Sequence, residues 1–232
     1  MSALLSPLSP EEISAIHVSL KVAGVATLAA LPFAVFVAYA LARWRFPGHA
    51  LLNAAVHLPL VLPPVVTGFA LLALFGKHAP LGAFLSDAFG LVFAFRWTGA
   101  ALAAAVMSFP LMLRPIRLAF ESIDPRLPQA SRALGANRLW TFLLVTLPLA
   151  APGVIVGAIL GFAKALGEFG ATITFVSNIP DETRTIPAAI YGLLQTPDGD
   201  AGALRLALIS AVIAAGALVL SEALQKRASA RS

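Results

Sequence analysis

The sequence contains no cysteine and has few charged residues for its length. Of its 232 residues only 12% are Asp, Glu, Lys or Arg, about half the share usual in soluble domains. The absence of cysteine excludes disulfides, thiolate metal sites and cysteine nucleophiles. The lack of charge, with 59% hydrophobic residues, argues against a soluble enzyme or a disordered regulator, because too few polar residues remain to cover a water-exposed surface. This composition indicates an integral membrane protein.

The sequence also argues against a nucleic-acid partner, a cleaved signal peptide and a metal site. The net charge of +5 suggests nucleic acid at first, but the basic residues are scattered between apolar blocks and form no patch, so we expect no nucleic-acid partner. The first twenty residues hold Glu11 and Glu12 without a basic cluster, so we expect no cleaved signal peptide. The four histidines show no pairing with acids, and we expect no metal site.

Long charge-free runs predict an all-α protein, because a spanning helix needs about 20 apolar residues. Unbroken apolar runs also argue against a membrane β-barrel, whose strands alternate in polarity. We expect a single domain over residues 1–232 with about five transmembrane helices. The expected spans are roughly 16–42, 50–76, 97–118, 145–177 and 203–224.

The positions of Lys and Arg predict the orientation, since cytoplasmic loops carry an excess of both. With the N-terminus outside, ten basic residues fall inside and four outside. The inside set is Arg43, Arg45, Arg114, Arg117, Arg126, Arg132, Arg138, Lys226, Arg227 and Arg231, and the outside set is Lys77, Arg96, Arg184 and Arg205. We therefore expect the N-terminus outside and the C-terminus in the cytoplasm.

The inner loop, residues 121–144, contains the clearest local signals. Asp124 followed by Pro125 predicts a helix start, because it offers a capping acceptor and then proline at the first helical position. Gly135 fits a C-terminal cap, and Asn137 fits the N-cap of a second helix. Taken alone, this pattern also suits a plain amphipathic connector on the inner leaflet.

The order of residues in this loop resembles the signature of permease subunits of ABC importers. That signature is Glu-Ala-Ala, three residues, Gly, nine residues, then Ile-x-Leu-Pro. Here the spacing is intact, with Gln for Glu, Ser for the second Ala and Val for Ile. The matching residues are Gln129, Ala130, Ser131, Arg132, Gly135 and the run Val145-Thr146-Leu147-Pro148. The loss of the acid puts in doubt any charge contact expected at Gln129.

Other segments, across about 19–224, resemble molybdate importer permeases. They are His57-Leu-Pro-Leu-Val-Leu-Pro-Pro-Val-Val-Thr-Gly68, Ala105-Val-Met-Ser-Phe-Pro-Leu111, Ala165-Leu-Gly-Glu-Phe-Gly-Ala-Thr-Ile-Thr-Phe-Val-Ser-Asn-Ile-Pro180 and Glu182-Thr-Arg-Thr-Ile-Pro187. Sulfate permeases share the loop and a Gly-Glu-Phe-Gly segment. Each short match is weak alone, but together they are specific.

The resemblance implies the type I ABC importer permease fold in the bacterial cytoplasmic membrane. It also implies a homodimer, with a second permease copy, two ATPase subunits and an external substrate-binding protein as partners. The helix at 125–135 would dock on the ATPase, through Gln129, Ala130, Ser131, Arg132 and Gly135. ATP and Mg²⁺ would be used by that ATPase. This chain itself contains no G-x-x-x-x-G-K-[ST] phosphate loop, so we expect no catalysis and no cofactor bound here.

Charges and breaks inside the spans are the candidates for a translocation path or gate. Lys164 and Glu168 are four residues apart, so a pair on one helix face is expected, either as a structural pair or beside the path. Thr172 and Thr174 offer hydroxyls, although such groups often bond back to their own helix. The prolines and glycine that interrupt the second apolar run are Pro59, Pro63, Pro64 and Gly68; they predict a kink or break, which we place at the dimer interface or gate.

The predicted path carries no arginine cluster, so we expect a neutral path that passes a molybdate anion without holding it. Tungstate or sulfate remain alternative substrates. A secondary transporter is the alternative from another class, but it would require internal repeats, which the sequence does not show.

Overall fold

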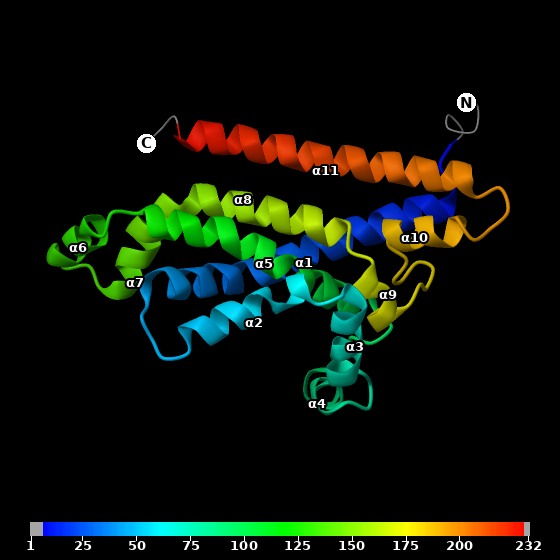
Figure 1. The fold of residues 1–232 in the computed structure, drawn as a ribbon, viewed down its shortest axis with the longest axis horizontal. Helices are drawn as coiled ribbons and strands as arrows, with labels where there is room; N and C mark the ends of the chain where they lie inside the picture. Colours follow the sequence, from blue (N-terminus) through cyan, green and yellow to red (C-terminus); the bar gives the residue numbers. More distant parts are fainter. Residues whose placement is uncertain (1–6, 230–232) are drawn as a thin grey trace.

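The computed structural model describes residues 7–229 and is entirely helical over that range. Four long helices run along the axis of the molecule (Figure 1): α1 (Pro10–Arg43), α5 (Trp97–Ser122), α8 (Leu147–Leu166) and α11 (Asp200–Ser229). α1 begins at one end of the bundle and α11 finishes at the other. This arrangement agrees with an odd number of membrane crossings.

Among the described residues, four helical segments are long and apolar enough to cross a membrane, and a bent pair brings the number to five. The bent pair consists of α2 (His49–Val61) and α3 (Pro64–Phe75), whose axes differ by 114°. The all-α fold with about five spans is therefore confirmed. The bend leaves α3 standing across the bundle axis, with α4 (Pro80–Phe89) at its tip (Figure 1).

Small residues hold α1, α5 and α8 together. Ala23 of α1 and Ala100 and Ala104 of α5 are fully buried. On α8, a Cβ atom added to Gly157 would lie 2.6 Å from the carbonyl oxygen of Met112 on α5. This spacing requires glycine and lets the two backbones approach closely, as is typical of membrane helices.

The fourth predicted span, 145–177, is not one helix. α8 ends at Leu166, and a separate short helix, α9 (Gly170–Val176), follows after a break. The Glu168 side chain bonds to the backbone N–H of Ala171 at 3.0 Å, so it satisfies a donor in the first turn of the new helix. The expectation of one continuous helical run through Lys164 and Glu168 was wrong, because hydropathy stays high across this break.

The join between the inner loop and the membrane helix has a wider turn. α7 (Arg138–Thr141) continues into a π-helical turn over Phe142–Thr146 and then into α8. Pro148 has no N–H and its ring crowds the carbonyl four residues earlier, which disfavours a regular α-helix there. The π turn accommodates the proline of the Leu-Pro motif without ending the helix.

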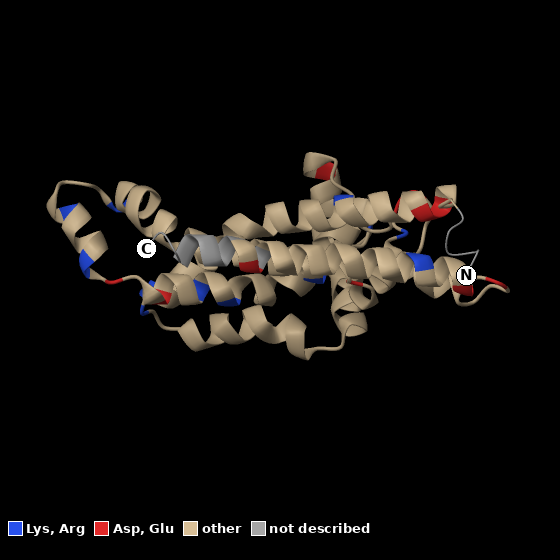
Figure 2. Ribbon diagram, turned by 90° about the horizontal axis from the view of Figure 1, so that it is seen from above, with Lys and Arg blue, Asp and Glu red and all other residues tan. Residues whose placement is uncertain are grey.

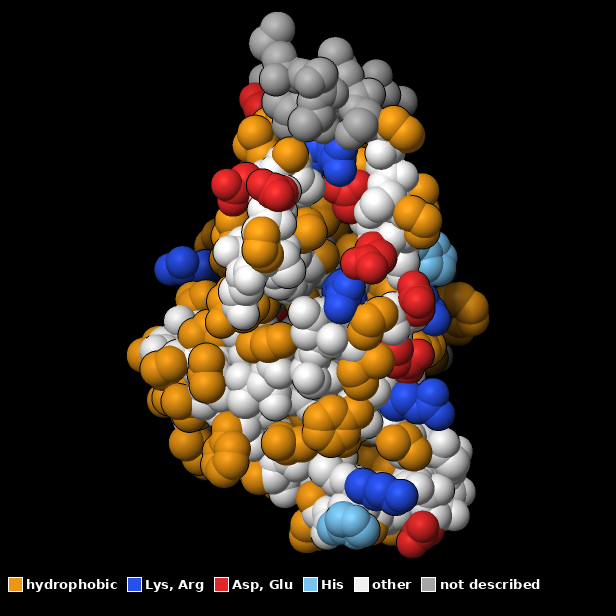
Figure 3. Space-filling model, turned by 90° about the vertical axis from the view of Figure 1, so that its right-hand side faces the viewer, with side chains coloured by type: hydrophobic (Ala, Val, Ile, Leu, Met, Phe, Trp, Pro, Cys, Tyr) orange, Lys and Arg blue, Asp and Glu red, His pale blue; other side chains and the backbone are white. Residues whose placement is uncertain are grey.

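Charge is divided between the two ends of the bundle. Basic residues gather near the end that carries α6 (Arg126–Ala133), and most acidic residues lie toward the end that carries α10 (Ile186–Leu193) (Figure 2). Seen end-on from the α10 side, acidic and basic side chains share the surface and hydrophobic ones cover much of the flanks (Figure 3). The basic residues at 226 and 227 lie where side chains are not described, and Arg231 lies outside the described residues.

Candidate functional site

The predicted coupling helix is present as α6, and the capping residues expected from the sequence lie at both of its ends. The Asp124 carboxylate accepts a hydrogen bond from the N–H of Arg126 at 2.9 Å. At the other end Gly135 has a φ of +93°. Its N–H bonds to the carbonyl of Arg132, and the next N–H bonds to that of Ser131. These two bonds form the Schellman motif, which requires a left-handed residue at the position of Gly135.

A second short helix completes this unit. The Asn137 side chain accepts from the N–H of Trp140 at 2.9 Å and caps α7, as the sequence predicted. The hydroxyls of Ser131 and Thr141 lie 3.3 Å apart and connect α6 to α7. The loop is therefore a rigid helix–turn–helix projection and not an extended connector.

α6 leaves its apolar side chains uncovered. None of its residues is buried, and Leu134, directly after it, is 90% exposed. Gln129, Ala130 and Arg132 are exposed and Ser131 is half-buried. Exposed leucine beside exposed polar residues on a projecting helix is the composition of a docking surface.

The proline break brings two predicted regions together. Pro63 and Pro64 have no N–H, so the carbonyls of Pro59 and Leu60 lose their helical partners and the chain turns after α2. α3 then packs on α9. A Cβ on Gly68 would lie 2.5 Å from the carbonyl oxygen of Ala171 and 2.9 Å from the Cβ of Thr174, so only glycine fits here.

Not all members of the predicted gate meet in one place. Pro64 lies against Gly170, where an added Cβ would lie 2.7 Å from its ring. α2, which contains Pro59, has no buried residue at all, and Pro63 is exposed. The structure thus places Pro64 against Gly170 and Gly68 against Thr174 at the α3–α9 contact. Pro59, which is half-buried, and Pro63, which is exposed, lie outside this contact.

The predicted intramembrane ion pair is formed. Lys164 Nζ lies 3.0 Å from Glu168 Oε2, with the two side chains 31% and 2% exposed. Glu168 also accepts from the N–H of Ala171. The carboxylate therefore neutralises the lysine and holds the first turn of α9, which is a structural task.

The two threonines differ. Thr174 donates to the carbonyl of Gly170 at 2.8 Å, the backbone bond that threonine in helices commonly makes. Thr172 is 1% exposed, and neither its hydroxyl nor that of Thr67 on α3 has a hydrogen-bond partner among the residues that the structure describes. Buried hydroxyls normally have a hydrogen-bond partner, so these two groups near the α3–α9 contact remain able to bind a further polar group.

We expect a Glu168→Ala variant to be less stable than a Lys164→Ala variant. The first removes the cap of α9 and leaves the lysine charge unpaired, at a cost of about 2 kcal/mol. The second leaves Glu168 bonded to the N–H of Ala171. The thermal unfolding midpoint in detergent compares the two.

Uptake by the transporter that the sequence resemblance implies would distinguish a structural role of Lys164 from a role in the translocation path. We expect Lys164→Ala to keep transport once its expression is matched to wild type. Loss of transport with normal assembly and normal coupling to ATP hydrolysis would instead assign the lysine a direct role in the path.

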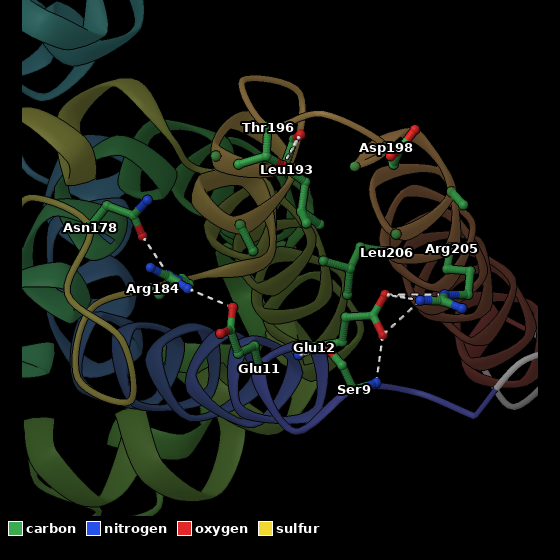
Figure 4. Close-up of a pocket in the computed structure, with 15 residues that line it drawn as sticks. Ser9, Glu11, Glu12, Asn178, Arg184, Leu193, Thr196, Asp198, Arg205 and Leu206 are labelled. Atoms are coloured by element: carbon green, nitrogen blue, oxygen red, sulfur yellow. Dashed lines mark hydrogen bonds and ion pairs between the residues drawn. The ribbon is translucent and has the colours of Figure 1, made fainter. Parts of the chain in front are cut away.

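A pocket of about 580 Å³ lies at the opposite end, between the start of α1, α10 and the start of α11. Figure 4 shows its two arginines turned to carboxylates. Arg205 makes a fork on Glu12, with contacts of 2.9 and 3.1 Å, and Arg184 bonds to Glu11 and Asn178. Both guanidinium groups bind carboxylates of this chain. Their ion pairs join the helices that line the pocket, so the pocket does not offer an anion a strong binding site.

The family follows from comparison with known sequences. Residues 30–230 match the family described as binding-protein-dependent transport system inner membrane component. The chain belongs to this family.

Individual relatives are similar over nearly the full length. The molybdenum transport system permease protein ModB of Escherichia coli K12 is 58% identical, over 93% of this chain and 94% of that protein. ModB of Haemophilus influenzae is 52% identical over the same shares. The sulfate transport system permease protein CysT of Salmonella typhimurium is 36% identical, over 91% of this chain and 75% of that protein.

Solved structures show the same fold. A bacterial ABC transporter for import of alginate has a TM-score of 0.73 at 20% identity, covering 94% of this chain and 80% of that chain. The MetNI methionine ABC transporter has a TM-score of 0.69 at 15% identity, covering 93% and 95%. The fold is thus that of type I ABC importer permeases.

Sequence reasoning missed the contacts that fasten the helix ends of this permease. Glu12 and Arg205 are 193 residues apart, and nothing local relates them. The only indication in the sequence was that each residue is charged and lies near the edge of a predicted span, where an unpaired charge is expensive to bury.

Proposed function

We propose that this chain is the permease subunit of an ATP-driven importer of molybdate. The observation that carries the proposal is its 58% identity, over 93% of the chain, to a molybdenum transport permease. The sulfate permeases are more distant, at 35–36% identity. Because the similarity to the molybdenum proteins extends through both ends of the bundle, it includes the surfaces that select partners as well as the fold.

The chain in this proposal transmits energy and does not hydrolyse ATP. α6 and its Schellman cap present Leu134 and the residues 129–131 to a groove on a separate ATPase, which uses ATP and Mg²⁺. The Arg132 side chain instead lines the space between α6 and α1. A rigid helix pair is suited to this task, because a flexible loop would absorb the movement of the ATPase instead of passing it to α8. Two ATPase subunits serve two copies of the permease.

The second copy of the chain covers α2 and the start of α3. Irregular backbone at membrane depth needs protein cover, since lipid cannot satisfy the freed carbonyls. The carbonyls of Pro59 and Leu60 are such groups, and the apolar residues beside them are uncovered: Val61 is 80% exposed and Phe69 is 65% exposed. A homodimer with α2 and α3 at its centre places the predicted gate on the two-fold axis.

The path in this arrangement is close to neutral. Its one charged pair, Lys164 with Glu168, cancels itself, and the hydroxyls of Thr67 and Thr172 remain unpartnered. Hydroxyls bind a tetrahedral dianion weakly, and weak binding allows the anion to leave the path toward the cytoplasm. Capture then falls to an external binding protein at the end that carries α10, which faces outward if the N-terminus is outside.

Uptake in cells tests the substrate. Expressed with its ATPase and binding protein in a strain lacking its own molybdate permease, the chain should restore molybdate accumulation at low external molybdate. A tenfold excess of tungstate should compete, because the two oxyanions have the same shape and charge, whereas the same excess of sulfate should not. Uptake that sulfate suppresses and molybdate does not would assign the chain to sulfate import, and uptake that persists without the ATPase would indicate a secondary transporter.

A further inference from the structure

A groove of about 800 Å³ opens between the inner half of α1, α6 and the α7–π turn, away from the α3–α9 contact. Its floor is aromatic. Tyr39 packs edge-on against Trp44 and Phe142, with ring centroids 6.0 and 5.0 Å apart, and Phe36 packs edge-on against Trp44. Phe36 and Trp44 are 59% and 47% exposed, so this floor is open.

The rim of the groove is basic and has no acid. Arg43, Arg132 and Arg138 line it, and no Asp or Glu does. Arg43 is fixed by two bonds to carbonyls at the end of α5, at 2.7 and 2.6 Å. Arg132 bonds through Nε to the carbonyl of Pro128, and within residues 7–229 neither Arg132 nor Arg138 has an ion-pair partner.

The groove has the depth of one lipid leaflet. The α1 residues that line it, from Pro32 to Arg43, recur on one helix face. At about 1.5 Å per residue they extend roughly 16 Å along the helix, and half of a hydrocarbon core is about 15 Å. Tryptophan at one end of such a track is typical of the headgroup level.

We propose that this groove binds one anionic phospholipid of the leaflet at the α6 end, with its phosphate at Arg132 and Arg138 and one acyl chain along the α1 face toward Pro32. Basic pockets between helices on the cytoplasmic side recognise such headgroups. A zwitterionic lipid fits less well, because the rim offers no carboxylate for its ammonium group. The lipid joins α1 to the coupling unit, so the anionic lipid content of the membrane becomes a factor in coupling.

Native mass spectrometry of the full chain, extracted from membranes and titrated with phosphatidylglycerol or phosphatidylcholine, tests this site. We expect one tightly bound phosphatidylglycerol per chain and no comparable phosphatidylcholine. The double variant Arg132→Gln, Arg138→Gln should weaken phosphatidylglycerol binding about thirty-fold, taking the usual contribution of a basic residue at a lipid surface. The matched control, Arg45→Gln with Arg126→Gln, removes two charges near the same end but outside the groove, and should keep the lipid.

Three outcomes would overturn the proposal. Equal loss in the control variant would mean that only the general surface charge attracts lipid. Displacement of the bound lipid by the partner ATPase would mean that the groove belongs to that subunit, and absence of a bound lipid in the dimer would mean that a second copy covers it. None of these readouts depends on which oxyanion is transported.

Discussion

Gly135→Glu should abolish transport while leaving membrane insertion intact. Gly135 follows α6 with a φ of +93°, and a Cβ atom added there would have no atom of this chain within 4 Å. In the proposed complex, however, the new side chain places a carboxylate at the end of the helix that enters the ATPase groove. An unpaired charge buried in an interface costs about 3–5 kcal/mol, which corresponds to about two to four orders of magnitude in ATPase binding.

Gly48→Glu is the matched control for this variant. Gly48 also has a φ of +93° and nothing within 4 Å, and it lies in the turn before α2, in a loop expected on the same side of the membrane. Both variants introduce the same left-handed strain, of about 1–2 kcal/mol, and the same charge. Pull-down of the ATPase and oxyanion uptake should fail for Gly135→Glu alone. Equal failure of both variants would attribute the effect to backbone strain, and normal uptake in Gly135→Glu would exclude α6 as the coupling helix.

Gly68→Ala should separate α3 from α9 and reduce transport strongly. The added methyl group would lie 2.5 Å from the carbonyl oxygen of Ala171 and 2.9 Å from its Cα. Both are backbone atoms, so no side-chain rotation relieves the clash and one helix must move. We expect a loss of stability of about 1–3 kcal/mol, seen as a lower thermal midpoint, together with loss of uptake because the gate residues sit on these two helices.

Gly24→Ala provides the comparison. Gly24 lies within α1 and has nothing within 4 Å of an added Cβ, so alanine there should be neutral or stabilising by up to about 1 kcal/mol, as helix propensity predicts. If Gly68→Ala matched wild type in both midpoint and uptake, the close α3–α9 contact would have no part in transport. A lower midpoint with full uptake would make the contact structural only.

Most of the helical architecture was predictable because its signals are local. Charge-free runs gave the number of crossings, and Pro63 with Pro64 gave the bend. In the inner loop, Gly135 and Asn137 each cap a helix within four residues of their own position, so the sequence pattern alone was sufficient to place α6 and α7.

The remainder depended on distant contacts. The break after Leu166 lies inside an apolar stretch and carries no hydropathy signal; the new helix is stabilised by the hydrogen bond that the Ala171 N–H donates to the Glu168 carboxylate. Hydropathy also does not predict that α3 turns by 114° and meets α9, because that direction is set by glycines that allow close packing. The contact of Arg205 with Glu12 joins α1 to α11 at the end of the bundle that carries α10, between residues 193 positions apart.

The central claim is that this permease passes molybdate under the control of an ATPase. The most direct test is ATP hydrolysis by the chain reconstituted in liposomes with its ATPase and its binding protein, each oxyanion being loaded in turn. We expect hydrolysis to be stimulated by molybdate-loaded and tungstate-loaded binding protein, little by sulfate-loaded protein, and not at all when the chain carries Gly135→Glu. Stimulation by sulfate alone, or hydrolysis indifferent to the permease, would contradict it.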